Sequence, residues 1–334
     1  MDSVTQIALG AAVGEATLGS KVGSRAMLWG AICGTLPDLD VFVPLGDAVR
    51  DFTYHRSASH SLIVLAILSP LMVWLILKVH PQTSQYRYRW LALVYLVFAT
   101  HALLDSFTVY GTQIFWPIDD TPMTWSTIFI IDPVYTMPLL IGVTAALVMS
   151  RNRPMGHRLN WAGLALSTAY LAWTVGAKLH VEHIARESLA EQGIAYEHLL
   201  TVPAPLNSVL WRVLASNEDS YHEGFYSFFD DDDDIPMHAY PSEPALLKGI
   251  EDHWPVVRLR WFTKGFYSVT RIDRDVIVTD LRMGVEASYT FRFKVGEIGN
   301  PHTSPSQPER LIPVREYGRL KNVWARIWNE DAKI

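Results

Sequence analysis

The chain has 334 residues, of which 49% are hydrophobic, and a formal net charge of −6. This length is more than one ordinary soluble domain needs. The acidic balance argues against a nucleic-acid-binding protein, because such proteins usually carry a basic patch. The single cysteine, Cys33, excludes an intrachain disulfide and a metal site built from several cysteines. Any metal ligands must therefore be His, Asp or Glu.

Apolar runs dominate the chain up to about residue 180, and the chain is polar after about residue 185. Four runs have the length and composition of membrane spans: 61–79, 90–104, 126–149 and 161–179. Two shorter runs, rich in Gly and Ala, are either tightly packed spans or a re-entrant pair: 4–18 and 26–36. We therefore predict an α-helical membrane bundle of about four to six spans over residues 1–190.

Lys and Arg are distributed unevenly over the connections between these six runs. Three connections are basic, and their basic residues are Lys21 and Arg25, then Lys78, Arg87 and Arg89, then Arg151, Arg153 and Arg158. The connection before residue 61 holds only Arg50 and Arg56, and the connection after Leu104 holds neither Lys nor Arg. The positive-inside rule places the basic connections in the cytoplasm. A multi-pass protein of the cytoplasmic membrane is predicted, with everything after residue 180 facing outward.

Ionisable residues gather on the predicted outward side of the bundle. Three separate stretches bring carboxylates and imidazoles to one membrane depth: Asp38, Asp40, His55, His60, His101 and Asp105. The i, i+4 spacing of His101 and Asp105 places both on one helix face. These groups are the oxygen and nitrogen ligands that zinc, manganese or iron prefer. The set could hold two metals, as in many phosphoesterases.

Each pair of these residues also has a structural alternative. The two early aspartates could cap a helix, the first two histidines could lie at the membrane interface, and the last pair could form a packed hydrogen bond. Together they favour a metal site, because ionisable residues within spans are costly and usually functional. Asp38 and Asp40 are also candidates for the catalytic base. Arg56 is predicted to bind an oxyanion or phosphate, with an interfacial anchor as its alternative.

Five motifs follow one another in the apolar part: MDSVTQIALGAAVGEA, GTLPDLD, HRSASHS, THALLDSFTVYGTQIFWP and IDPVYT. In this order they resemble the bacterial membrane-bound metal-dependent hydrolases of the YdjM-like family, over residues 1 to about 180. Later stretches, among them PLNSVLWRV and TDLRMG, are similar to the C-terminal extension of its longer members. The resemblance implies that the six residues above bind metal. Many members have a His near the start of the chain, where this sequence has Gln6.

Three further polar features have simpler explanations. Asp132 precedes Pro133 within an apolar run, and a bend there could aim its carboxylate at the site as a partner of a ligand. The five-Asp run 230–234 lacks the spacing of a known calcium loop and is expected to be a solvated turn. His180 and His183 could bind metal, but a continuing amphipathic helix explains them.

Residues 191–334 are predicted to form a soluble, mainly β domain. Short alternating runs recur over about 208–296, including VVRLRWF at 256–262, and Arg274-Asp275 suggests a hairpin between two of them. A last amphipathic stretch surrounds Trp324 and Trp328. The chain contains no catalytic-triad motif, glycine-rich phosphate loop or dinucleotide fingerprint.

These features predict a metal-dependent hydrolase at the outer face of the cytoplasmic membrane. In this hypothesis a metal-activated water attacks a phosphoester or similar bond of a lipid or envelope substrate. Zinc is the expected ion, with manganese or iron as alternatives. The competing hypotheses are a metal-binding or transport protein without hydrolytic chemistry and a structural membrane protein. Transport would favour polar residues at mid-membrane in several helices, whereas these cluster at one face. The bilayer is the expected partner, and nucleic acid is not.

Overall fold

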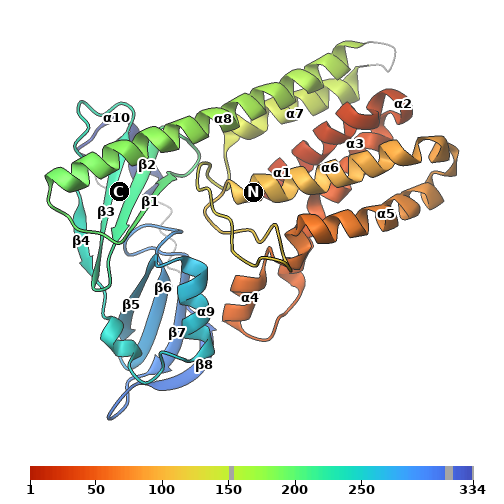
Figure 1. Cartoon of the computed structure of the whole chain (residues 1–334). Helices are drawn as coiled ribbons and strands as arrows, with labels where there is room; N and C mark the ends of the chain where they lie inside the picture. The colour runs from red at the N-terminus through yellow and green to blue at the C-terminus, as the bar shows by residue number, and fades with distance from the viewer. Residues whose placement is uncertain (150–153, 313–318, 333–334) are drawn as a thin grey trace. The chain divides into compact units, whose positions relative to one another are not determined.

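The computed structural model describes residues 1–149, 154–312 and 319–332 (Figure 1). The chain divides into unit 1, formed by Met1–Val43 and Arg56–Val175, and unit 2, formed by Pro44–His55 and Gly176–Ile334. Unit 1 is helical and unit 2 contains the strands, so the predicted helical region followed by a β domain is confirmed. Arg151 and Arg153, which contributed to the predicted orientation, lie outside the described residues.

The longer helices of unit 1 are α1 (Ser3–Gly14), α3 (Ser24–Thr35), α5 (Leu62–Val79), α6 (Arg87–Ser106), α7 (Pro133–Val148) and the first part of α8 (Pro154–Glu191). Short elements connect them: η1 (Glu15–Gly19), α2 (Ser20–Val22), η2 (Pro37–Phe42), η3 (Ala58–His60) and η4 (Pro81–Tyr86). The first is a π-helical turn and the η elements after it are 3₁₀ helices.

Glycines bring the backbones of α1 and α3 close together. A Cβ atom at Gly10 would lie 2.2 Å from the carbonyl oxygen of Gly30, and one at Gly34 would lie 2.5 Å from that of Gln6. Small residues permit such contact between helices in apolar surroundings. The first two Gly- and Ala-rich runs of the sequence are therefore tightly packed helices. Their packing also fixes the position of the C-terminal end of α3, from which η2 starts.

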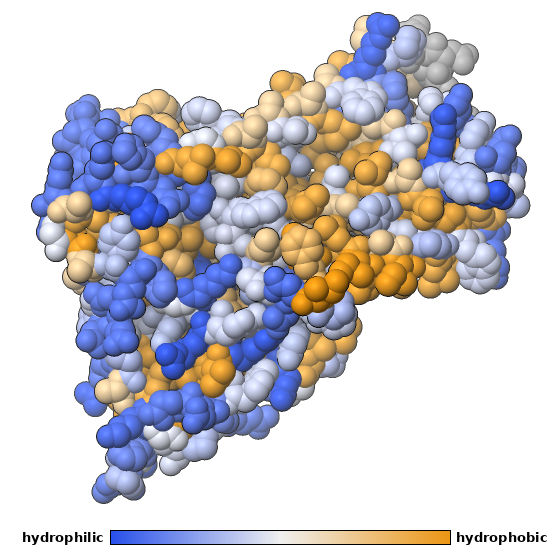
Figure 2. Space-filling view, in the orientation of Figure 1, coloured by the Kyte–Doolittle hydropathy of each residue, from blue (hydrophilic) through white to orange (hydrophobic). Residues whose placement is uncertain are grey.

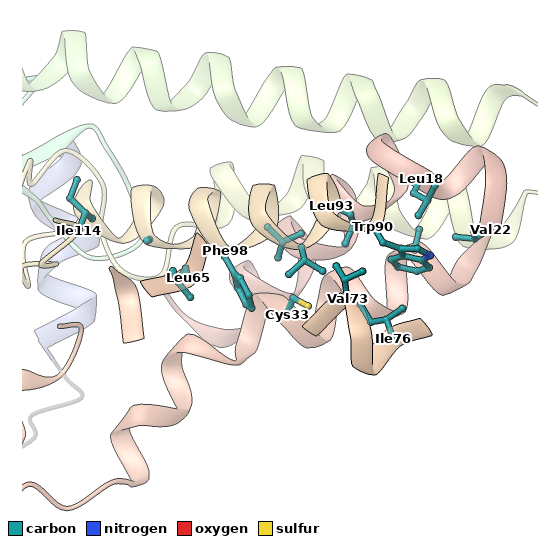
Figure 3. Packing of buried hydrophobic residues seen from close by; sticks show 14 residues of the cluster. Leu18, Val22, Cys33, Leu65, Val73, Ile76, Trp90, Leu93, Phe98 and Ile114 are labelled. Atoms are coloured by element: carbon teal, nitrogen blue, oxygen red, sulfur yellow. The ribbon is translucent and has the colours of Figure 1, made fainter. Parts of the chain in front are cut away.

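The hydrophobic core of unit 1 lies where α5 and α6 pack against α3 and η1 (Figure 3). Its buried side chains include Leu18, Cys33, Leu65, Val73, Ile76, Trp90, Leu93 and Phe98. Trp90 also satisfies its indole, because Nε1 donates to Thr83 Oγ1 at 3.1 Å. Burial of these side chains holds the start of α5 beside the end of α6, and the candidate site lies there.

Among the described helices, α5 is the one that is both long and apolar enough to cross a membrane, and α7 is apolar but shorter. Large apolar side chains of α5 are exposed, including Ile67, Leu71 and Trp74. Hydrophobic residues also gather on the surface of the helices of unit 1 in Figure 2. In water such a surface would favour aggregation, whereas lipid would cover it. The total number of spans stays a prediction.

Unit 2 contains two four-stranded antiparallel sheets, each in sequence order. The first sheet comprises β1 (His198–Pro203), β2 (Leu210–Ser216), β3 (Ser220–Ser227) and β4 (His238–Pro241). The second comprises β5 (Tyr267–Ile272), β6 (Asp275–Asp280), β7 (Phe291–Glu297) and β8 (Ser304–Arg310). The helical elements of unit 2 are α4 (Ala48–Tyr54), η5 (Pro244–Leu247), α9 (Trp254–Thr263), α10 (Arg319–Trp328) and the second part of α8.

The predicted hairpin is confirmed, because β5 and β6 pair around a turn at Asp273 and Arg274. The prediction of a strand at VVRLRWF is wrong, because this segment forms α9. Pro255 occupies the first turn, where a missing N–H costs nothing. Val256, Leu259 and Phe262 are buried at a spacing of three residues, which places them on one helix face.

α4 is part of unit 2, although its segment lies between two stretches of unit 1. Phe52 is buried, and its ring centroid lies 4.4–5.2 Å from three other rings of unit 2: Phe262, Phe291 and Phe293. Thr53 Oγ1 accepts from Arg258 Nε at 3.1 Å. The second sheet therefore builds part of its core from a segment near the start of the chain.

A buried arginine joins the first sheet to the loops after β6. Arg212 Nε donates to Glu223 Oε2 at 2.6 Å, and its other nitrogens donate to the Leu281 carbonyl at 2.8 Å and the Tyr289 hydroxyl at 3.1 Å. Each guanidinium nitrogen therefore has a partner, as a cation out of contact with water requires. Removing the arginine would leave the Glu223 carboxylate buried without its counter-charge.

We expect Arg212→Ala to lower the free energy of unfolding of unit 2 by about 3–5 kcal/mol, the usual cost of breaking a buried ion pair. Denaturation of the detergent-purified protein, followed by near-UV circular dichroism, measures the change. Arg271→Ala is the control, because Arg271 is exposed on β5, and its effect should stay within about 0.5 kcal/mol. Equal effects of the two substitutions would show that the buried network does not hold the sheets together.

Candidate metal centre

Four ionisable side chains converge in unit 1 from three elements. Asp38 comes from η2, His60 ends η3, and His101 and Asp105 lie one helical turn apart on α6. The ligand atoms that these four residues offer all lie within 4.8 Å of one another. The two histidines and Asp105 are buried, whereas the side chain of Asp38 is 22% exposed. The group is thus open to solvent only on the Asp38 side.

The distances from the two histidines to each other and to the two carboxylates are close to those around a tetrahedral metal ion. His60 Nε2 lies 3.1 Å from His101 Nε2, 3.4 Å from Asp38 Oδ1 and 3.2 Å from Asp105 Oδ2. His101 Nε2 lies 3.6 Å from Asp38 Oδ1 and 3.8 Å from Asp105 Oδ2. Ligand distances of about 2.0–2.1 Å in a tetrahedral zinc site place neighbouring ligand atoms roughly 3.3 Å apart. The spacing of the four residues therefore fits one divalent ion.

Asp105 Oδ2 also fits a metal ligand by its surroundings. It is a buried carboxylate oxygen whose polar neighbours are Arg56 Nε at 3.1 Å and the two imidazole Nε2 atoms at 3.2 and 3.8 Å, none of them in hydrogen-bonding geometry. A buried carboxylate oxygen normally accepts a hydrogen bond, because leaving it unpaired costs roughly 1–3 kcal/mol or more. A cation bound among the ligand atoms would add a direct bond to this oxygen, beside its ion pair with Arg56.

Partners on the far side of each imidazole orient it toward the centre. His101 Nδ1 lies 2.8 Å from the carbonyl oxygen of Gly34, at the end of α3. Since a carbonyl can only accept, Nδ1 carries the proton in this bond and Nε2 keeps its lone pair for a metal. The close packing of α1 and α3 therefore contributes to the orientation of His101.

His60 is oriented through a short relay that ends at Asp40. His60 Nδ1 lies 2.9 Å from Ser59 Oγ, which donates to Asp40 Oδ2 at 2.6 Å. The same carboxylate oxygen accepts from the backbone N–H of Arg56 at 3.0 Å. Asp40 is therefore linked to the four-residue group through one intervening side chain, that of Ser59. Such outer carboxylates are common behind metal-bound histidines.

Arg56 balances the charge of Asp105. Its Nε atom lies 3.1 Å from Asp105 Oδ2, and Nη1 donates to Thr108 Oγ1 at 3.3 Å. The guanidinium carbon also lies 5.1 Å from the ring centroid of Tyr110. Arg56 is buried and has a φ of +64°, a conformation that is uncommon for non-glycine residues. This backbone turn directs the arginine inward, toward the end of α6.

The other oxygen of Asp105 has partners that the sequence analysis did not identify. The amino group of Met1 and Gln6 Nε2, the latter at 3.0 Å, both contact Asp105 Oδ1. Gln6 Nε2 also donates to the His101 carbonyl at 3.4 Å. Gln6 stands where many family members have a histidine near the start of the chain. That substitution was the one feature of the sequence that could have indicated a position beside the site.

Asp38 is held in its ionised form. Burial opposes ionisation, but the imidazoles of His101 and His60 outweigh it and hold the pKa of this carboxyl below its ordinary value. The ionised carboxylate is the form that binds a metal or accepts a proton. Asp38 is therefore the partly exposed member of the group and is ionised near neutral pH.

Two other predicted site residues are not members of this group. His55 directly follows α4 and belongs to unit 2, and it is not one of the four clustered residues. Asp132 caps α7, where its Oδ1 accepts from the backbone N–H groups of Val134 and Tyr135. Its Oδ2 accepts from the Tyr170 hydroxyl at 2.8 Å. These bonds explain the polar residue at this position without a contact to the site.

The acidic run of unit 2 serves structural contacts. Asp230 forms an ion pair with Arg326 of α10, Asp233 accepts from the Tyr226 hydroxyl at 3.0 Å, and Asp234 accepts from Ser188 at 3.1 Å. His183 is exposed and lies 3.5 Å from Glu187 on the same helix. Among the described residues, the group around His60 is the one with the spacing of a metal site.

We expect His60→Ala and His101→Ala each to lower metal content strongly, by at least about 10-fold in affinity, because each removes a ligand from the centre. Elemental analysis of the purified protein and competition with a chelator measure this loss. His183→Ala is the matched control, since His183 is exposed and distant in sequence. Full metal retention in the His60→Ala, His101→Ala double variant would exclude the site.

One of the comparisons with known proteins gives a match. Neither the curated proteins nor the solved structures contain a match to the chain. The family model described as YdjM inner membrane protein matches residues 1–181, which include all four clustered residues. The match covers more than half of the chain and ends within α8. The chain therefore belongs to the YdjM inner membrane protein family.

Proposed function

We propose that this protein is a metal-dependent hydrolase of the cytoplasmic membrane that cleaves a phosphoester or similar bond of a lipid or envelope substrate. One observation carries the proposal: three buried ligand atoms and one at an open edge are spaced as around a single ion. Two histidines with carboxylates form a donor set typical of catalytic zinc, and manganese or iron could also bind.

His60, His101 and Asp105 would hold the ion, since all three are buried and face one another. A divalent ion bound there would polarise the substrate and lower the pKa of a water molecule at an open coordination position. Asp38, at the exposed edge, is then placed to accept a proton from that water. Asp40 assists indirectly, because its hydrogen bond to Ser59 holds the orientation of His60.

Arg56 is proposed to stabilise negative charge that develops on the substrate. Its guanidinium carries five N–H donors in a fixed plane and can pair with Asp105 while it presents other donors to a phosphate oxygen. Contacts with Asp105, Thr108 and Tyr110 restrict its movement. A restricted donor loses little entropy when the transition state forms, which is the condition for effective electrostatic stabilisation.

A non-catalytic metal site is the second candidate. Structural zinc sites are typically closed by four protein ligands, and this group offers four. In that case Asp38 would complete the coordination shell and leave no position for water. Metal that is retained without any turnover would favour this alternative, or a transport or structural role.

We expect the zinc-loaded protein to hydrolyse phosphoester substrates in detergent or lipid. Arg56→Lys should keep the metal and the fold, because the charge that balances Asp105 remains, but should lower kcat by about 100-fold through loss of the planar donor array. Arg89→Lys is the control, since Arg89 is exposed at the start of α6, and its activity should be unchanged. The hydrolase proposal fails if the metal-loaded protein turns over no phosphoester, lipid or amide substrate.

The orientation of the protein is part of the same proposal. The uneven distribution of Lys and Arg supports a multi-pass arrangement in which the site and unit 2 face outward from the cytoplasm. An outward site has direct access to lipids of the outer leaflet and to envelope intermediates.

A membrane-impermeant maleimide, applied to intact cells, should label Glu218→Cys and not Tyr88→Cys, because the first position is predicted to face outward and the second to face the cytoplasm. Both residues are exposed in the protein. The native Cys33 is buried, so its background labelling should be low. Labelling of Tyr88→Cys alone would reverse the proposed orientation.

A further inference from the structure

An exposed apolar segment begins directly after Asp38. Leu39, Val41, Phe42 and Val43 all expose large parts of their side chains, with Phe42 79% and Val41 65% exposed. Four neighbouring apolar side chains of this size are unusual on a surface that faces only water. Because Asp38 is the partly exposed member of the metal-site group, the segment lies beside the open edge of the site.

The 3₁₀ conformation of η2 arranges this segment relative to Asp38. Side chains three residues apart align in a 3₁₀ helix, so Val41 lies on the same face as Asp38, and Phe42 lies on the same face as Leu39. A molecule that contacts Asp38 along this face therefore also lies beside Val41. Asp40, between these faces, turns away to hydrogen-bond with Ser59.

A second exposed apolar pair lies on the loop that packs against the start of α5. Phe115 and Ile118 are exposed, Ile118 by 83%. The loop is fixed at this place, because the Ile114 carbonyl accepts from Leu62 N at 3.0 Å and the Trp116 carbonyl accepts from the Ser61 hydroxyl. Phe115 and Ile118 therefore lie close in structure to His60, which directly precedes Ser61.

The depth of the site in the membrane identifies what covers these side chains. α5 is the apolar, membrane-length helix, and it begins at Leu62, two residues after His60. The site thus lies at the level where the hydrocarbon core of the bilayer gives way to headgroups. At this level acyl chains are available to apolar side chains, and phosphate groups are available to the metal site.

We propose that the substrate is a membrane phospholipid, whose acyl chains contact the apolar rim while its phosphate enters past Asp38. The apolar rim consists of Leu39, Val41, Phe42, Val43, Phe115 and Ile118. This inference rests on the proposed hydrolase function and selects lipids over water-soluble phosphoesters.

The proposed reaction is simplest for a phosphate monoester of a diacylglycerol. The oxygen of water forms a bond to phosphorus, and the P–O bond to the glycerol oxygen breaks with its electron pair. The proton that Asp38 removes from water is returned to that glycerol oxygen. The products are a diacylglycerol, which stays in the membrane along the apolar rim, and inorganic phosphate, which leaves through the exposed edge of the site.

The test compares phosphatidic acid in mixed micelles with p-nitrophenyl phosphate, which lacks acyl chains. The Val41→Ser, Phe42→Ser double variant should keep its metal and its activity on p-nitrophenyl phosphate. Its kcat/KM for phosphatidic acid should fall by at least about 10-fold, because two apolar contacts with the lipid are lost. The Val257→Ser, Ile272→Ser double variant is the matched control, since both residues are exposed in unit 2.

Three results would overturn the lipid inference. The first is full activity of the rim variant on phosphatidic acid, and the second is a preference of the unaltered protein for p-nitrophenyl phosphate. The third is a change of oligomeric state in the rim variant with lipid turnover intact, which would assign the rim to contact between copies of the chain. If the unaltered protein hydrolyses neither substrate, the proposed function fails separately. Binding of a phosphonate analogue of phosphatidic acid then decides the inference, because the rim variant must weaken that binding.

Discussion

The carboxylate of Asp105 is the constraint on which the arrangement of unit 1 depends. It is fully buried, and an uncompensated charge in such surroundings costs several kcal/mol. Arg56 supplies positive charge beside one oxygen, the Met1 nitrogen and Gln6 donate to the other, and His60 lies 3.2 Å from the oxygen that Arg56 faces. Balancing the charge of Asp105 therefore requires that the start of α1, the loop before α5 and the end of α6 lie together.

The glycines of α1 and α3 make this meeting possible. Close contact of the two backbones places the Gly34 carbonyl within reach of His101 and brings η2 to the end of α6. A larger side chain at Gly10 or Gly34 would push the helices apart, because the added atom would overlap a backbone carbonyl. Small residues that contribute no chemistry of their own thus determine whether Asp38 can face both imidazoles.

Much of unit 1 could be predicted from the sequence, because its signals are local. Hydropathy predicted α5 nearly residue by residue and the middle of α6, where the run 90–104 lies within Arg87–Ser106, and helical spacing placed His101 and Asp105 on one face. The contacts of Arg56 and Asp40 could not be predicted in this way. They depend on a left-handed backbone turn at Arg56 and on a serine between Asp40 and His60. Neither feature has a periodic signal in the sequence.

The difference between local patterns and long-range contacts also explains the wrong prediction in unit 2. The segment 256–262 alternates apolar and basic residues closely enough to resemble a strand, but its buried residues recur every third position because α9 packs by one face. The contact of Phe52 with Phe262 joins positions roughly 200 residues apart. No local pattern in the sequence could indicate a contact over that separation.

The placement of α4 has a consequence for how the protein is made. The rings around Phe52 belong to residues 262, 291 and 293, so ribosomes complete them long after α4 has been synthesised. Until then Phe52 and Val49, both buried in the finished protein, lack these partners, although the membrane-length helix α5 has already been synthesised. Domains generally fold as units during synthesis from the N-terminus. Here the last strands of the chain must instead close around one of its earliest helices, which makes this step sensitive to C-terminal truncation.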